Sequence, residues 1–402
     1  MTILRRLPAF LPLLLAFFLC LNNTVSAQNW EKMSFQGTSA YCFAEKDGVL
    51  FAGTNEGVYQ LESDGNTWKR IALPTRTIFT LIAKGDKMFC GTAGEGVLRS
   101  DDNGQNWTDA NGNIPKGISV QSLMVRDGAY LFAGTNVTGI YVSTDNGANW
   151  QAKGLSNEWI YSMVMNGETI FAGTFGNGIF RSADNGATWL KSDTGVTNPF
   201  VKALYSPSTS LVYAGTLGGG AFRSLSSGSS WTDISAGIAG REIRAITMGG
   251  KYNYLYVGTG KDGVFASADS GRSWQQFRQN LGNPSVNSLI ITKDYLIAGT
   301  DDGIYRQPYT PVGVEEEEYE AQNSVKIFPQ PAGNTGTSLR FPAQWHGRTI
   351  RLTLVNVMGE LMQSVECSDD VAHIPTSNLA SGVYLLRAEC GRESVMQKLV
   401  KE

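Results

Sequence analysis

The chain has 402 residues, 46 of them glycine, and a formal net charge of −3. This length allows two domains, and so much glycine is typical of a protein with many tight turns. A charge this close to zero argues against a nucleic-acid-binding groove, because such a groove needs a broad basic surface.

The N-terminus has the pattern of a secretory signal peptide. Arg5 and Arg6 give a positive start, residues 7–21 form an apolar run, and small residues stand at the cleavage site, Val25-Ser26-Ala27. The run is too short for a membrane anchor and contains two prolines. We therefore expect residues 1–27 to be removed on export, which leaves no transmembrane segment in the mature chain.

An apolar segment that ends in Gly-Thr recurs seven times, and successive copies are 38 to 43 residues apart. A repeat of this length is typical of propellers and solenoids. The seven threonines are Thr54, Thr92, Thr135, Thr174, Thr216, Thr259 and Thr300.

Most repeats then continue into a turn that ends in tryptophan. Four turns have the full sequence Ser-x-Asp-x-Gly-x-x-Trp, and two more, at residues 61–68 and 224–231, are degenerate. The aspartate can accept backbone N–H groups of its turn, and the tryptophan can fill the gap between neighbouring sheets. We assign a structural role to the residues of the full turns, which are Asp102, Trp107, Asp145, Trp150, Asp184, Trp189, Asp269 and Trp274.

This turn resembles the Asp-box, or BNR, repeat of sialidases, xyloglucanases, sortilin-type receptors and photosystem assembly propellers. The resemblance covers roughly residues 28–310 and implies a β-propeller. The seventh repeat lacks its own tryptophan, whereas Trp30 lies 38 residues before Trp68, which is one repeat length. We therefore predict a seven-bladed β-propeller over residues 28–310. Its N-terminal strand would complete the last blade and so remove the open sheet edges.

The repeat ends before an acidic linker, residues 311–323, which contains four consecutive glutamates. Beyond it, residues 324–402 show the alternation of short strands and predict a small Ig-like β-sandwich. Cys367 and Cys390 lie at the ends of expected strands there and could form a disulfide in an exported protein.

This tail resembles the type A C-terminal sorting domain of the type IX secretion system. The residues that carry the resemblance are Pro329, Pro331, Gly359, Gly382, Tyr384 and Lys398. Gln330 departs from the family pattern, which has asparagine at that position. The resemblance implies a Bacteroidota-type cell, the type IX machinery as a partner, and a secreted or surface-bound product. The alternative is a plain binding sandwich.

The repeat region contains no catalytic constellation that we can recognise. Both histidines, His346 and His373, lie in the tail, so a Ser-His-Asp triad or a histidine-ligated metal site cannot be built in the propeller. No calcium-loop pattern occurs in the repeats. We therefore assign no catalytic residues, no cofactor and no metal.

The innermost strands of the expected blades carry two positions of mixed chemistry. One holds Tyr41, Phe79, Gln121, Tyr161, Lys202, Arg244 and Asn287, and the other, two residues earlier, holds Ser39, Thr77, Ser119, Trp159, Phe200, Glu242 and Ser285. Strand alternation sends both sets in the same direction, toward the mouth of the central channel. Aromatic rings beside a cation and a carboxylate suit a sugar or a peptide. The predicted binding residues are Tyr41, Trp159, Tyr161, Phe200, Lys202, Glu242 and Arg244.

Three functions fit these patterns. The main hypothesis is a non-catalytic secreted or surface propeller that binds a glycan or an extracellular peptide or protein at the channel mouth. The second is a sialidase- or xyloglucanase-like glycoside hydrolase, which needs two carboxylates across the scissile bond, with Glu242, Glu56 and Glu95 as candidates. The third is an assembly or adhesion scaffold. We favour the first because the Arg-Ile-Pro motif of sialidases is missing.

Overall fold

The computed structural model describes most of the chain from residue 29 to residue 401. The described ranges are 29–250, 253–277, 280–308, 325–333, 336–342, 345, 347–356, 360–369, 371–391 and 393–401. The expected signal peptide, the acidic linker and Gly359 lie outside these ranges. Every secondary-structure element within them is a β-strand, so the all-β prediction is confirmed.

Residues 31–308 form seven separate sheets, six of four strands and one of five, which we number in chain order. Sheet 1 contains β2 (Ser34–Phe35), β3 (Ala40–Lys46), β4 (Val49–Thr54), β5 (Gly57–Leu61) and β6 (Thr67–Ala72). Sheet 2 contains β7 (Ile78–Lys84), β8 (Lys87–Thr92), β9 (Val97–Ser100) and β10 (Thr108–Asp109). Sheet 3 contains β11 (Val120–Arg126), β12 (Tyr130–Thr135), β13 (Ile140–Ser143) and β14 (Gln151–Ala152).

The remaining sheets repeat this plan. Sheet 4 contains β15 (Ile160–Asn166), β16 (Thr169–Thr174), β17 (Ile179–Ser182) and β18 (Leu190–Lys191). Sheet 5 contains β19 (Val201–Ser208), β20 (Leu211–Thr216), β21 (Gly220–Ser224) and β22 (Thr232–Asp233). Sheet 6 contains β23 (Ile243–Gly249), β24 (Tyr254–Thr259), β25 (Val264–Ser267) and β26 (Gln275–Phe277). Sheet 7 contains β27 (Val286–Ile291), β28 (Tyr295–Thr300), β29 (Ile304–Pro308) and β1 (Glu31–Lys32).

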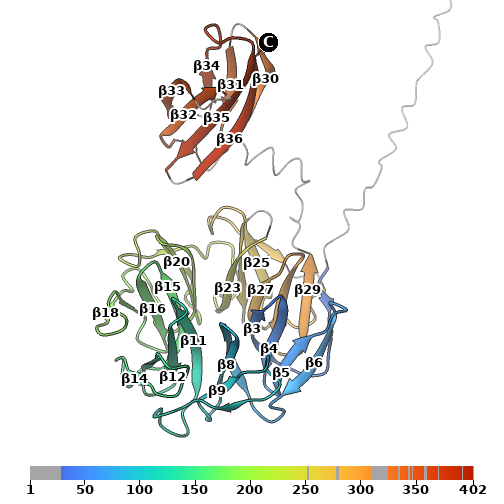
Figure 1. Ribbon diagram of the computed structural model, residues 1–402, viewed down its shortest axis with the longest axis vertical. Coiled ribbons are helices and arrows are strands. Elements are labelled where there is room, and N and C mark those ends of the chain that lie inside the picture. Colours follow the sequence, from blue (N-terminus) through green and yellow to red (C-terminus); the bar gives the residue numbers. More distant parts are fainter. Residues whose placement is uncertain are drawn as a thin grey trace, which may run out of the picture.

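The first long strand of each sheet lies innermost and contacts the inner strands of its two neighbours. This contact runs from β3 through β7, β11, β15, β19 and β23 to β27, and β27 contacts β3 in turn. The inner strands accordingly surround the middle of the array, with the short outer strands at its rim (Figure 1).

The glycine of each Gly-Thr pair lies where two sheets approach most closely. A Cβ on Gly53, for example, would lie 2.7 Å from the side chain of Ile78, the first residue of the next inner strand. The same clash, at 2.5 to 2.8 Å, occurs at the other six glycines, and Gly299 of sheet 7 meets Ala40 of sheet 1. Any larger residue would push the sheets apart or strain the core.

The N-terminal segment joins three sheets. β1 pairs with β29 as the outer strand of sheet 7, which is where the sequence predicts the N-terminal strand, and β2 pairs in parallel with β6 of sheet 1. Trp30, 3% exposed, donates its indole N–H to the carbonyl of Phe277 in sheet 6 at 3.0 Å. This short segment therefore ties the first sheet to the last two.

The Ser-Asp turns share one hydrogen-bond pattern. In the turn of sheet 3, the Ser143 hydroxyl donates to Asp145 and accepts the N–H of Gly147, both at 2.8 Å. Asp145 also accepts the backbone and side-chain N–H groups of Asn149 at 2.8 Å. The turns at Asp102, Asp184 and Asp269 repeat these bonds. In the degenerate turn of sheet 5, Ser226 replaces the carboxylate with weaker hydroxyl contacts.

The tryptophans link each turn to the preceding sheet. The indole N–H of Trp150 donates to Ala110, that of Trp189 to Lys153 and that of Trp274 to Ile234, at 2.6 to 2.8 Å. Trp30 makes the equivalent contact for sheet 7. Two tryptophans differ: the N–H of Trp107 returns to Gly104 of its own turn, and that of Trp68 donates to the sulfur of Met33.

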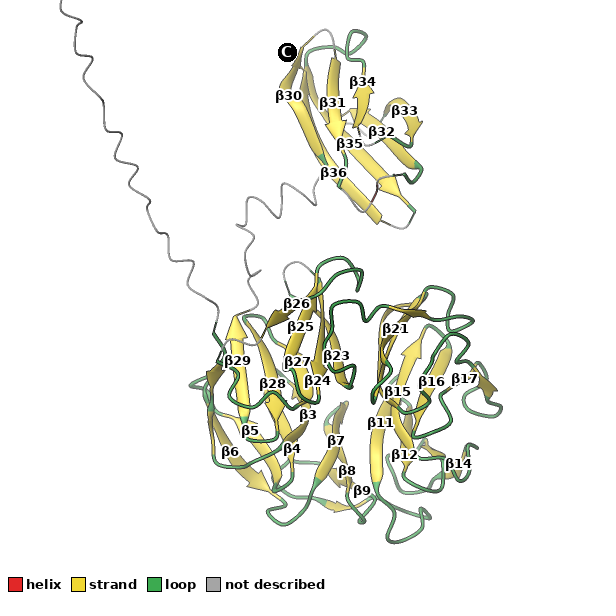
Figure 2. Ribbon diagram, turned by 180° about the vertical axis from the view of Figure 1, so that it is seen from behind, coloured by secondary structure: helices red, strands yellow, loops and turns green. Residues whose placement is uncertain are grey.

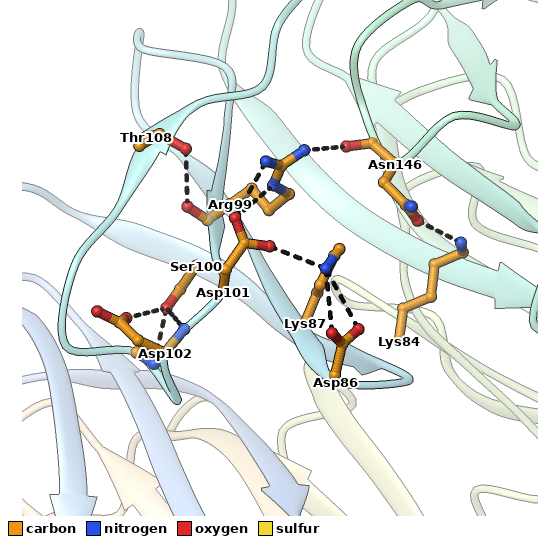
Figure 3. Close-up of polar contacts among 10 residues, drawn as sticks. Lys84, Asp86, Lys87, Arg99, Ser100, Asp101, Asp102, Thr108 and Asn146 are labelled. Atoms are coloured by element: carbon orange, nitrogen blue, oxygen red, sulfur yellow. Dashed lines mark hydrogen bonds and ion pairs between the residues drawn. The ribbon is translucent and has the colours of Figure 1, made fainter.

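Cations of one sheet also bind the turn of the next. Figure 3 shows Arg99 of sheet 2 donating to the backbone carbonyl of Asn146, and Lys84 donating to the side chain of the same residue at 2.5 Å. Arg99 and Lys87 share the carboxylate of Asp101, which holds the arginine in place. Arg181, Arg223 and Arg306 make the corresponding bonds to the turns that follow them.

The C-terminal residues form a second all-β unit. Its strands are β30 (Lys326–Gly333), β31 (Gly336–Arg340), β32 (Ile350–Asn356), β33 (Leu361–Cys367), β34 (Val371–Ile374), β35 (Gly382–Cys390) and β36 (Glu393–Lys401). They are connected in the order β33-β32-β35-β36-β30-β31-β34. Leu352, Leu354, Leu386 and Trp345 belong to its buried core, and the strands are visible in Figure 2.

Two of the predicted sorting-motif residues have describable roles in this unit. Gly382 begins β35, and the buried Tyr384 donates its hydroxyl to the carbonyl of Ala380 at 2.8 Å. Pro329, Pro331 and Lys398 lie on β30 and β36, but their side chains fall outside the described part.

The structure contradicts the suggested disulfide. Cys367 and Cys390 are not bridged to each other: they lie on β33 and β35, and β32 runs between those strands. Two strand spacings of about 4.8 Å separate the backbones by roughly 10 Å, whereas a disulfide needs Cα atoms within about 7 Å. The sequence showed strand ends but not strand order. Cys42 and Cys90 are not bridged either, as expected for packed thiols.

Replacing Trp30 by alanine tests the N-terminal closure. The change removes a buried ring and its bond to sheet 6, so we expect the free energy of unfolding to fall by about 3–5 kcal/mol. Denaturant unfolding of the chain from residue 28 measures it. Glu31→Ala is the matched control, because it loses only an exposed ion pair with Arg306, worth less than about 1 kcal/mol. Equal losses in both variants would contradict the closure role.

The Asp turns predict a pH dependence of stability. Hydrogen bonds from Asn149 and Ser143 lower the pKa of Asp145 to about 2, and those from Thr188 and Ser182 do the same for Asp184. Because the folded pKa lies below the unfolded value, both groups stabilise the protein above about pH 4, and this stabilisation is lost as the pH falls toward 2.

We therefore expect Asp145→Asn/Asp184→Asn to be less stable than the parent at pH 7. The gap should narrow as the pH drops from 4 to 2, measured by urea unfolding at each pH. The control is Asp294→Asn, which removes one exposed loop carboxylate. A gap that stays constant down to pH 2 would contradict the assignment.

Candidate functional site

The threonine of each Gly-Thr pair fixes a loop at the start of the inner strands. Thr174 is fully buried, and its hydroxyl donates to the carbonyl of Gly178 at 2.9 Å and accepts the N–H of Asn177. The other six threonines donate to a glycine carbonyl in the same way, at 2.8 to 3.0 Å. The residue after the threonine then binds the inner strand: the N–H of Phe175 donates to the carbonyl of Trp159 at 2.9 Å.

A β-bulge at the start of every inner strand places the predicted binding residues. The register between the inner strand and its neighbour shifts by one residue in all seven sheets. The residue skipped by each shift is Tyr41, Phe79, Gln121, Tyr161, Lys202, Arg244 or Asn287, the first mixed position of the sequence. A bulge bends its strand and redirects a side chain. The bulges therefore place these residues, whereas the sequence pattern had predicted regular strand alternation.

Four aromatic rings of sheets 4 and 5 form one cluster. Trp159 lies 5.1 Å from Tyr161 and 5.1 Å from Phe175, measured between ring centroids. Phe175 lies 4.7 Å from Phe200 and 5.4 Å from Tyr161. The planes are inclined to one another by 38° to 87°, and Phe175 remains 41% exposed. Such clustering of apolar surface at an accessible position is typical of a recognition site.

Lys202 extends this cluster with a positive charge. Its Nζ lies 4.3 Å from the centroid of the Tyr161 ring, a cation–π contact. Burial and the positive charge of Arg244 lower the pKa of Lys202 to about 8. No carboxylate lies within ion-pair distance of Lys202 among the residues described. We call Trp159, Tyr161, Phe175, Phe200 and Lys202 the mouth cluster.

Arg244 is instead fully engaged. It pairs with Glu242 at 2.7 Å and donates to Ser285 at 2.8 Å and to Asn287 at 3.1 Å. Asp301, from the loop after Thr300, closes the group: it accepts from Ser285 and Asn287 and lies 3.9 Å from Arg244. These five residues, the Arg244 network, bind one another, and neither of their carboxylates lies within ion-pair distance of Lys202.

The structure brings Trp159, Tyr161, Phe200 and Lys202 together, and it pairs Glu242 with Arg244. Tyr41 lies apart from them and packs 6.0 Å from Phe79 of sheet 2.

Two residues of the site were missed. Phe175 and Asp301 both follow the threonine of a Gly-Thr pair. An alignment of that single position across the repeats would have found them, because the other occupants are asparagine, alanine, leucine or glycine.

Each carboxylate proposed for hydrolysis has its own arginine. Glu56 pairs with Arg70 at 3.6 Å, and Glu95 pairs with Arg76 at 2.6 Å. Glu242 is held by Arg244. Each of the three carboxylates is thus engaged in a separate ion pair.

Two open concavities lie elsewhere on the surface. One is lined by Gln36, Asp64 and Arg70, and the other, between sheets 1 and 7, by Gln60 and Arg306 among others. Neither includes a residue of the mouth cluster. Within the described ranges, no three His, Cys, Asp or Glu side chains are grouped to hold a metal. The part of the chain that the structure describes also has no helix of the length and apolarity that crossing a bilayer would require.

Models of known families match two parts of the chain. Residues 19–118 and 81–200 match the DUF6242 beta propeller domain. Residues 326–402 match the secretion system C-terminal sorting domain. The second match indicates that the protein is exported by type IX secretion, to the cell surface or into the medium. No match is found among curated proteins.

Solved structures of similar fold come from several sources. The extracellular domain of a hybrid two-component system of B. thetaiotaomicron is 18% identical, with a TM-score of 0.61 over 78% of this chain and 45% of that one. PorZ, a surface component of the type IX secretion system of Porphyromonas gingivalis, is 16% identical, with a TM-score of 0.55 over 91% and 59%. YCF48 bound to D1 peptide is 15% identical, with a TM-score of 0.59 over 72% and 98%.

The chain spans about half the length of the first two structures. At these identities the likeness concerns the fold, which is that of β-propeller proteins, and not the function.

Replacing Thr174 by valine tests how the loop holds Phe175. The valine keeps the shape but loses the hydroxyl bonds to Gly178 and Asn177, so we expect a loss of about 1–2 kcal/mol in the free energy of unfolding. Thr135→Val, the equivalent change in sheet 3, where the loop binds Ser119 and not an aromatic residue, should cost a similar amount. Only Thr174→Val should also change the near-ultraviolet circular dichroism of the aromatic rings. Identical spectra for both variants would show that the threonine does not position Phe175.

Proposed function

We propose that this protein is a non-catalytic, exported β-propeller that binds a peptide or glycan at the mouth of its central channel. In this proposal the seven sheets are the blades of one propeller of Asp-box (BNR) repeats, closed by the N-terminal strand after removal of the signal peptide. The continuous contact of the inner strands, the pairing of β1 with β29 and the repeated Ser-Asp turns support this architecture.

The observation that carries the binding proposal is the mouth cluster. All seven inner strands share one backbone plan, yet the bulges of sheets 4 and 5 bring a lysine against an aromatic ring, whereas those of sheets 1 and 2 bring two aromatic rings together without a cation. Packing does not require this, since Gln121 and Asn287 occupy the same position in sheets 3 and 7. A partly exposed aromatic group beside an uncompensated cation is suited to ligand recognition.

Hydrolysis is the less favoured alternative. A glycosidase needs one carboxyl group that delivers a proton and a second that acts as base or nucleophile. At the inner-strand ends, Glu242 and Asp301 both contact the cation of Arg244, and Asp301 accepts two further hydrogen bonds. Both carboxylates are therefore held by the same guanidinium and its partners.

The tail is the proposed contact with the export machinery. We infer that residues 324–402 form an Ig-like sandwich in which Pro329, Pro331, Gly359, Gly382, Tyr384 and Lys398 carry the sorting signal read by the type IX apparatus. The propeller, residues 28–310, would then be the delivered part, and residues 311–323 the linker. The peptide in the YCF48 structure is consistent with a propeller of this kind that accepts a peptide.

Binding arrays test the proposal. The chain from residue 28 is screened on glycan and peptide arrays beside Trp159→Ala/Lys202→Ala, and we expect at least a tenfold weaker signal for the variant on any ligand that binds the parent. Tyr41→Ala, outside the mouth cluster, is the control and should bind like the parent. A ligand that binds all three proteins equally would place recognition on another surface and refute the channel-mouth site.

A further inference from the structure

One cation at the inner-strand ends, Lys202, lies outside the ion pairs that the described residues form there. Glu242 and Asp301 are committed to Arg244, Ser285 and Asn287. Lys202 faces the Tyr161 ring and the positively charged Arg244, with no acid in reach among the described residues. A half-buried ammonium that has no counter-charge in the protein is suited to an anion brought by a ligand.

The unsatisfied polar groups of the mouth cluster are both donors. Lys202 has three N–H groups to offer, and the buried indole N–H of Trp159 has no acceptor in the structure. The carboxylates of the Arg244 network bind Arg244, Ser285 and Asn287, and neither lies within ion-pair distance of Lys202. The complementary ligand group is therefore one that only accepts hydrogen bonds, and an ionised carboxylate is such a group.

The aromatic rings favour a side chain over a sugar ring. Flat sugar faces stack on an open aromatic face, but Trp159, Tyr161, Phe175 and Phe200 lie against one another at steep angles and cover much of their own surface. Sugars also need several donors and acceptors for their hydroxyl groups, and the side chains that could provide them bind each other. An apolar side chain can instead pack against Phe175, which is 41% exposed.

We propose that the mouth cluster binds a peptide segment in which a carboxylate pairs with Lys202 and a neighbouring apolar side chain packs against Phe175 and Trp159. The inference rests on the proposed function, because it needs the channel mouth to be a binding site. The carboxylate comes either from an aspartate or glutamate side chain or from a chain terminus, since both present the same chemistry.

The position of Lys202 also makes this binding pH-dependent. The groups that face it are Tyr161 from β15 and Arg244 from β23, and Arg244 in turn contacts the carboxylates of Glu242 and Asp301. Burial raises the pKa of Tyr161 above its ordinary value of 10, so this phenol stays neutral between pH 7 and pH 9. With the Lys202 pKa near 8, the ammonium is present at pH 7 and mostly lost at pH 9, so affinity for a carboxylate should fall about tenfold over this range.

Peptide arrays of defined charge test the proposal on the chain from residue 28. Each peptide places leucine or phenylalanine next to glutamate, glutamine or lysine, and is printed both with a free C-terminus and as the amide. We expect glutamate peptides to bind at least tenfold more tightly than glutamine peptides if the side chain is the anchor. If the terminus is the anchor, we expect the same preference for free over amidated ends.

Three variants identify the cation. Lys202→Met, which keeps most of the apolar stem, should lose the preference for carboxylate. Lys202→Arg should keep that preference but lose the decline between pH 7 and pH 9, because arginine stays charged. Lys116→Met, an exposed loop lysine on sheet 2, should behave like the parent in both respects.

The outcomes separate the two proposals. Peptide binding that ignores carboxylates, or that is unchanged in Lys202→Met, overturns this inference but leaves the binding site in place. Binding of glycans alone, uronic acids included, overturns the peptide assignment. No binding on either array, with Trp159→Ala/Lys202→Ala identical to the parent, overturns the proposed function as well.

Discussion

The close approach between each Gly-Thr glycine and the next inner strand is the constraint on which the rest of the propeller region depends. Gly53 meets Ile78, Gly173 meets Val201, and the series ends where Gly299 meets Ala40 of the first sheet. Because the absence of a Cβ sets how near two sheets can come, seven copies of one small residue determine the spacing of the whole array. The adjoining threonine turns the chain back at the same point. A single dipeptide thus controls both the packing of the sheets and the position of the loops at the site.

The sequence predicts the architecture better than the site. The Gly-Thr spacing and the tryptophan at residue 30 are periodic signals, so they indicate the number of repeats and the sheet that the N-terminal strand joins. The bulges leave no such signal, because a register shift depends on pairing between strands and not on residue type. The sequence correctly predicts that Lys202 and Tyr161 lie close together, but that prediction assumes regular strand alternation. In the structure each strand bends at a bulge, and the bulge sets the direction of these side chains. The suggested Cys367–Cys390 bridge failed similarly, because strand order in the tail cannot be read from strand sequence.

The site and the frame are chemically independent of each other. Residues that hold the sheets, such as Thr174 and Ile160, are fully buried. The bulge residues beside them vary from Gln121 to Lys202 without disturbing the strand pairing. The backbone carbonyl of Trp159 accepts the N–H of Phe175, and this bond does not involve the Trp159 side chain. Recognition can therefore be altered at these positions at little cost in stability, which is how one fold supports many functions.

The contact between residue 31 and residue 306 has a consequence for the order of events in the cell. Glu31 and Lys32 pair with Arg306 and Tyr305, partners that are 275 and 273 positions away in the chain. Loops of this length close slowly because most of the ordering entropy must be lost before the contact forms. Sheet 7 cannot gain its outer strand until the final repeat has emerged from the ribosome, so the nascent chain remains an open array until then.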